Sequence, residues 1–166
     1  TPPRAWREGF AAALQPIAAR RNRQRLATRI IDVEDIYNTF SHGLVDVEAI
    51  RRFATAGAPY GLRYILLAGN GSLDFQHYAN DVNTVASALI PTIPTPQNFM
   101  SGEGMTAASD APLGDVDNDG VPEVAIGRLP TTKLSEITNF VAKTIAYECA
   151  RRYDLPVTLT ADWDNV

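Results

Sequence analysis

Residues 114–130, GDVDNDGVPEVAIGRLP, decide the fold of this chain. The first half is an acidic loop with Asp at alternate positions, followed by a Gly and a Glu. The second half, residues 124–129, is an apolar run that ends at Pro130 and is typical of a buried strand. Carboxylates crowded into one loop repel each other unless a cation lies among them. The stretch therefore indicates a strand that is preceded by a candidate cation site.

The acidic loop matches the ligand pattern of a calcium site. Calcium takes roughly six to eight oxygen ligands from carboxylates and backbone carbonyls. The candidate ligands are the carboxylates of Asp115, Asp117, Asp119 and Glu123 and the carbonyl of Val121. The longer EF-hand loop is absent, because its Glu lies further along the chain and a helix follows it. The alternative is a solvated hairpin whose Asp, Asn and Gly residues suit turn dihedrals, and the sequence leaves both interpretations open.

The composition indicates a single globular, acidic domain. The chain has 166 residues, of which 45% are hydrophobic and 20% charged, enough for a substantial core. Its formal net charge of -4 argues against a broad nucleic-acid-binding surface. No apolar run is long enough to form a membrane span. Cys149 is the single cysteine, so no disulfide can form within the chain.

Hydrophobic periodicity predicts that helices and strands alternate along the chain. The predicted helices cover residues 6–17, 34–40 and 46–56 and the stretch from a cap at Thr131 or Thr132 to Cys149, and the predicted strands cover residues 26–33, 64–68, 124–129 and 157–161. Pro16 should kink the first helix or start a second one. Residues 64–68 lack alternation, as in a central parallel strand that is covered on both faces. Residues 73–113 are irregular, apart from a short edge strand at 90–93.

Together these elements predict an α/β fold. The expected architecture is a three-layer sandwich with a mostly parallel sheet, similar to a flavodoxin-like subdomain, with the acidic hairpin loop at one end.

Six short blocks carry a resemblance to a known family. They are residues 32–41 (DVEDIYNTFS), 48–53 (EAIRRF), 64–74 (YILLAGNGSLD), 109–110 (SD), 122–130 (PEVAIGRLP) and 145–148 (IAYE). In this order they resemble the gingipain-like cysteine peptidases, peptidase family C25. The resemblance implies a caspase-like catalytic domain of two α/β subdomains. Residues 1–153 would form the first subdomain, and residues 154–166 the first strand of the next.

The resemblance also implies how the function is divided. In the family, the catalytic His, in a His-Gly pair, and the nucleophilic Cys both come later than Val166. This part of the domain would therefore be non-catalytic alone. Its partners would be the remainder of the catalytic domain and, in the full enzyme, a protein or peptide substrate. A secreted or cell-surface location follows from the same resemblance.

Two sets of site residues follow from the resemblance. Family members carry calcium at positions that match the carbonyls of Val116 and Val121 and the carboxylates of Asp119 and Glu123. An acid at the position of Asp162 can orient the catalytic His, although the gingipains have Glu there. A simple loop or capping acid is the alternative for Asp162, and Asp164 is a competitor for the orienting role.

The remaining residues with chemical potential are predicted to be structural. His42 precedes Gly43 but lies in a part of the family that carries no chemistry, and His77 is expected to be solvated. Cys149 is expected on a buried helical stripe made by Leu134, Ile137, Val141, Ile145 and Cys149. Residues 69–71 favour a tight turn over a phosphate cradle, and Arg128 is expected to pair with the acidic loop.

Three functions remain as hypotheses. The first is the N-terminal part of a gingipain-like cysteine peptidase domain, stabilised by Ca²⁺. The second is a non-enzymatic, calcium-stabilised α/β module of a secreted or surface protein. The third is a nucleotide-binding flavodoxin-like domain that uses residues 69–72. Sequence after Val166 distinguishes the first two, because the peptidase requires a His-Gly pair after one strand and a Cys after the next.

Overall fold

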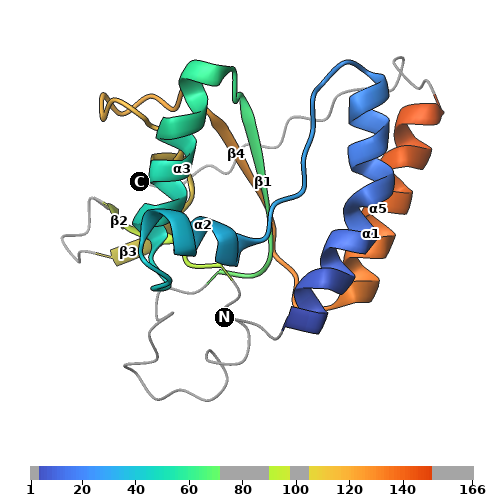
Figure 1. The fold of residues 1–166 in the computed structure, drawn as a ribbon, viewed down its shortest axis with the longest axis horizontal. Coiled ribbons are helices and arrows are strands. Elements are labelled where there is room, and N and C mark those ends of the chain that lie inside the picture. Colours follow the sequence, from blue (N-terminus) through green and yellow to red (C-terminus); the bar gives the residue numbers. More distant parts are fainter. Residues whose placement is uncertain (1–3, 72–89, 98–104, 151–166) are drawn as a thin grey trace, which may run out of the picture.

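The computed structural model describes residues 4–71, 90–97 and 105–150. Its helices are α1 (Arg4–Arg23), α2 (Val33–Phe40), α3 (Val47–Gly57) and α5 (Leu134–Cys149), with short 3-10 turns η1 (Ala58–Tyr60) and η2 (Ala111–Leu113). Its strands are β1 (Tyr64–Ala68), β2 (Ile93–Gln97), β3 (Met105–Ser109) and β4 (Ala125–Leu129). Helices α2 and α3 lie on one side of β1 and β4, and α1 and α5 lie on the other (Figure 1). This arrangement confirms the predicted α/β sandwich.

The sheet is formed by two strands that lie far apart in the sequence. β1 pairs with β4 in parallel, with Tyr64 opposite Ala125 and Ala68 opposite Leu129. This pairing confirms the predicted parallel sheet and both of its strands. A second, antiparallel pair joins β2 to β3, with Ile93 opposite Ser109. Both of its strands fall in the segment predicted to be irregular, and β2 begins where the predicted edge strand ends.

Side-chain caps explain where the two short helices begin. Asp46 accepts a hydrogen bond from the Glu48 amide at 3.0 Å and so caps α3, as predicted. Asp32 caps α2 in the same way through Glu34. The predicted Thr cap of α5 is wrong, because the residue before this helix is Lys133, which makes no side-chain cap bond.

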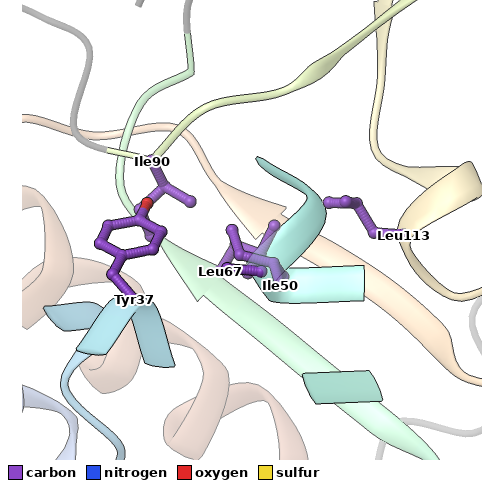
Figure 2. Close-up of a cluster of buried hydrophobic side chains, with 6 residues drawn as sticks. Tyr37, Ile50, Leu67, Ile90 and Leu113 are labelled. Carbon is purple, nitrogen blue, oxygen red and sulfur yellow. The ribbon is translucent and has the colours of Figure 1, made fainter. Parts of the chain in front are cut away.

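One hydrophobic core lies between the sheet and the α2/α3 layer. Its buried members come from both helices, from β1 and from the segments that flank β2 and β4: Tyr37, Ala49, Ile50, Leu67, Ile90 and Leu113 (Figure 2). The Tyr37 hydroxyl is buried without a hydrogen-bond partner among the described residues, and burial raises its pKa. The opposite face of β1 differs, because Tyr64 is 71% and Leu66 is 47% exposed. The prediction that this strand is covered on both faces is therefore wrong for the described residues.

The strand predicted at residues 26–33 is also wrong. Residues 26–32 form no helix and take part in no strand ladder, and α2 begins at Val33. The Asn22 side chain forms the hydrogen bonds that a neighbouring strand would otherwise form with Thr28. It accepts from the Thr28 amide at 2.7 Å and donates to the Thr28 carbonyl at 3.1 Å. Leu26 and Ile31 remain about half exposed. A β-branched run becomes a strand only when another strand offers it hydrogen bonds.

Helices α1 and α5 pack against each other as the second helical layer. α1 continues through Pro16, so the alternative of a second helix starting there is wrong. Glu148 joins the ends of the pair, because Arg21 and Arg20 donate to its carboxylate and lower its pKa to about 2. The described part of the chain holds no helix with the length and apolarity of a membrane span.

Only part of the predicted α5 stripe is buried. Ile137 and Val141 are buried, as predicted, but Leu134 is 48% exposed and Cys149 is exposed at the end of the helix. The prediction of a buried cysteine is therefore wrong. α5 packs against α1, and its last residue, Cys149, remains exposed although Arg20 of α1 approaches its sulfur.

Candidate metal site

The acidic loop joins η2 to β4 and is fixed at its base. Leu113 and Val124 are completely buried on either side of it. The Val124 amide donates to the Gly114 carbonyl at 3.1 Å, which closes the loop. Position 114 must be glycine, because a Cβ there would lie 1.9 Å from the Val124 carbonyl oxygen. The loop therefore starts and ends at rigid points.

Three carboxylates of this loop converge. Asp115, Asp117 and Glu123 each offer an oxygen atom, and these oxygens lie within 4.8 Å of one another. Oδ1 of Asp115 is buried and has no hydrogen-bond partner among the described residues. Burial of a carboxyl oxygen without a partner is costly, so this atom makes the loop a candidate cation site.

Backbone amides of the loop orient the same carboxylates. The Val116 amide donates to Glu123 at 2.9 Å, and the Gly120 amide donates to Asp115 at 3.0 Å. The chain turns tightly enough for these bonds because Asn118 and Gly120 adopt positive φ angles of 62° and 91°. Asn and Gly are the residues that tolerate this left-handed conformation best. The turn residues thus place carboxylates toward a common centre.

The donor set suits a hard cation. Every candidate ligand is an oxygen, and calcium accepts carboxylate and carbonyl oxygens in flexible geometry. Within the described residues, no ion pair links a Lys or Arg to the three converging carboxylates. Their negative charge is therefore not balanced by a direct salt bridge. The residues present fit calcium, and Asp115, Asp117 and Glu123 would hold it.

The remaining predicted ligands have less defined places. Asp119 accepts from the Val121 amide at 2.8 Å in its own local turn and does not belong to the converging group. Val121 is 64% exposed at the loop surface. Asp162 and Asp164, the candidates for orienting a catalytic His, lie outside the described residues, as does His77.

Arg128 has a different partner from the predicted one. Its guanidinium pairs with Asp110 through two hydrogen bonds of 2.6 and 2.8 Å instead of with the acidic loop. It also donates to the carbonyls of Gly69, Ile90 and Pro91. Thr92 donates to Asp110 at 3.1 Å and completes the network. This hydrogen-bond network around Arg128 connects the ends of β1 and β4 to the segment before β2.

The first two amides of the turn after β1 bond to the backbone at the end of β4 and just after it. The Gly69 amide donates to the Leu129 carbonyl and the Asn70 amide to the Thr131 carbonyl, both at 3.0 Å. A phosphate site would need such amides to point outward and be free. The structure therefore supports the tight structural turn at Gly69 and Asn70, whose amides are not free to bind a phosphate.

The described Cys and His belong to opposite layers of the sandwich. Cys149 ends α5, and His42 follows α2 on the other side of the sheet (Figure 1). Arg20 lies 3.4 Å from the Cys149 sulfur. A Cys/His pair needs its side chains within hydrogen-bond reach, which the intervening sheet prevents here.

A comparison with protein families matches residues 5–165 to peptidase family C25. The chain belongs to peptidase family C25. This membership confirms the resemblance seen in the ordered sequence blocks, and it makes the chain a peptidase-related domain of a cysteine peptidase family. No curated protein matches this C25 chain significantly, and neither does any solved structure.

Two interactions of this C25 domain could not be read from the sequence. The Arg128–Asp110 pair joins residues 18 positions apart, and a bond between Arg51 and Asn118 joins residues 67 positions apart. The only sequence signal was that Ser109-Asp110 and Gly127-Arg128 both fall in blocks shared with the family. Asn118 was recognised only as a turn residue.

Proposed function

We propose that residues 1–153 form the supporting subdomain of a C25 cysteine endopeptidase and that residues 154–166 begin the next subdomain. In the full enzyme, a Cys thiolate attacks the peptide carbonyl, a His acts as general base, and water hydrolyses the acyl-enzyme. The Cys and the His would both come from the rest of the catalytic domain, which is the binding partner of this subdomain. Asp162 is the candidate for orienting the His. A secreted or cell-surface location is part of the proposal.

One observation carries the proposal. The family match extends over nearly the whole chain, yet the described Cys149 and His42 sit on opposite sides of the sheet. A cysteine peptidase needs these two groups in contact. A C25 chain in which the described Cys and His lie apart can still be part of a peptidase if the catalytic Cys and His belong to another part of the enzyme.

We further propose that the acidic loop holds Ca²⁺ as a structural ion. The converging oxygens of Asp115, Asp117 and Glu123 and the unpartnered Asp115 oxygen support this proposal. The ion would neutralise the carboxylates. It would also hold the loop in place next to β4, the strand that directly follows the loop. Its contribution is to stability, since a cation that binds only the folded state stabilises that state by mass action.

A non-enzymatic calcium-binding module is the second candidate. It is favoured by the same separation of Cys149 from His42, because such a module needs no catalytic pair. A His-Gly pair and a Cys in the parent polypeptide, each after a strand, would favour the peptidase.

Residues 1–166 alone should show no peptidase activity. The purified polypeptide, assayed against casein and fluorogenic peptides with and without Ca²⁺, is expected to give the background rate. Cys149→Ala is the matched control and should leave that rate unchanged. Turnover well above background that Cys149→Ala abolishes would show that the catalytic thiol lies within this stretch, and turnover that the purified chain retains after Cys149→Ala would show a nucleophile other than a cysteine. Either result would refute the proposed role.

A further inference from the structure

The tip of the acidic loop is fastened to α3 by a single side-chain bond among the described residues. The base of the loop is held by buried neighbours, but residues 117–121 are exposed. Arg51, in the middle of α3, donates from Nη1 to Oδ1 of Asn118 at 2.5 Å. In Figure 1 the loop projects beside α3, and the two elements share a small pocket whose lining includes Arg51, Arg52, Val116 and Asn118. Arg51 is therefore the link between loop tip and scaffold.

Arg51 is itself oriented by its own helix. Its Nε donates to Glu48 at 2.8 Å, one turn earlier on α3. This bond leaves Nη1 directed at the loop. The residue it reaches, Asn118, has a φ of 62°, the left-handed conformation on which the tight turn depends. A bond to the Asn118 side chain restrains the backbone at the point where the loop reverses direction.

We propose that Arg51 is a positioning residue for the metal loop, holding Asn118 so that the three carboxylates are pre-organised for the cation. This inference rests on the proposed calcium site. Ordering a flexible loop costs free energy when a ligand binds, and a restraint already present in the free protein removes part of that cost. The Arg51 charge has the opposite effect, because a nearby positive charge repels a cation. The two effects predict changes of opposite sign when Arg51 is replaced.

Arg52 provides a matched control for charge. It is the neighbouring residue on α3, but its Nη1 donates to the Phe40 carbonyl and not to the loop. Ca²⁺ binding is measured by calorimetry on the full chain. We expect Arg51→Met to weaken Ca²⁺ binding about threefold to tenfold, within the range for the loss of one typical intramolecular hydrogen bond. Arg52→Met should leave it unchanged or slightly tighter.

A double-mutant cycle with Asn118→Gly tests the contact itself. Glycine keeps the left-handed conformation accessible but removes the acceptor. Asn118→Gly should weaken Ca²⁺ binding to a similar degree, and Arg51→Met should add little in the double variant. Tighter binding in Arg51→Met, or fully additive effects, would overturn the proposal.

Amide hydrogen exchange, measured in the presence of a chelator, distinguishes the role of Arg51 in ordering the loop from the binding of the metal. Amides of residues 115–121 should exchange faster in Arg51→Met than in wild type or Arg52→Met, in the absence of any cation. Equal exchange rates would overturn the positioning role even if wild type binds Ca²⁺. Absence of Ca²⁺ binding by wild type would instead overturn the metal site, and with it the role of Arg51 in cation binding.

Discussion

Gly114→Ala should destabilise the protein by about 3 kcal/mol, the upper part of the range for overpacking. The added methyl carbon would lie 1.9 Å from the Val124 carbonyl oxygen and 3.1 Å from Cγ1 of Ile126. Backbone must move to relieve this clash, because the nearest atom is not the end of a flexible side chain. The movement would break the bond that closes the loop and would displace Asp115 from the other two carboxylates.

The control for Gly114 is a glycine that is constrained by conformation alone. Gly61 has a φ of 89°, and a Cβ there would meet nothing within 4 Å. Gly61→Ala should therefore cost only the strain of a left-handed residue, about 1 kcal/mol. Urea unfolding of both variants gives the comparison. A loss in Gly114→Ala no larger than in Gly61→Ala would show that the loop base is not tightly packed.

Arg128→Met should cost about 3 kcal/mol, near the lower end of the range for breaking a buried ion pair. Only 12% of the Arg128 side chain and 19% of the Asp110 side chain are exposed. The substitution would leave the Asp110 carboxylate without its charged partner and remove donors from three backbone carbonyls. The hydrogen bonds by which Arg128 connects the ends of β1 and β4 would be lost.

Two variants check the Arg128 prediction. Removing Asp110 as well, in Arg128→Met/Asp110→Asn, should cost less than the sum of the single changes, because no unpaired charge is left. Arg4→Met serves as a control, since Arg4 forms an exposed ion pair with Glu8 that contributes little. Unfolding free energies measure all variants. Similar losses of unfolding free energy in Arg4→Met and Arg128→Met would contradict a structural role for the Arg128–Asp110 network.

Local patterns predicted the elements whose formation depends on nearby residues. Asp46 starts α3 because its carboxylate reaches an amide two residues on, and residues 125–129 form a strand within the predicted run. The acidic loop was visible for the same reason. The convergence of Asp115, Asp117 and Glu123, rather than of all the acidic side chains, depends on the exact turn at Asn118 and needed three-dimensional geometry.

Long-range partners explain where prediction from sequence was wrong. Residues 26–33 have strand composition, but no strand of the described part of the chain pairs with them, and Asn22 bonds to Thr28 instead. Arg128 was assigned to the nearest acidic loop, whereas folding brings Asp110 to it. Neither choice of partner leaves a local pattern in the sequence.

We expect the acidic loop to bind Ca²⁺ and thereby to stabilise the fold. The most direct measurement is thermal unfolding in excess CaCl2 and in chelator, with MgCl2 as the competing cation and Asp115→Asn as the matched variant. At a Ca²⁺ concentration of about 100 times Kd, wild type should gain about 2.7 kcal/mol and a higher Tm. Asp115→Asn should lose this gain, because it removes the charge that the unpartnered oxygen carries. An identical Tm for wild type in millimolar Ca²⁺ and in chelator would contradict the claim.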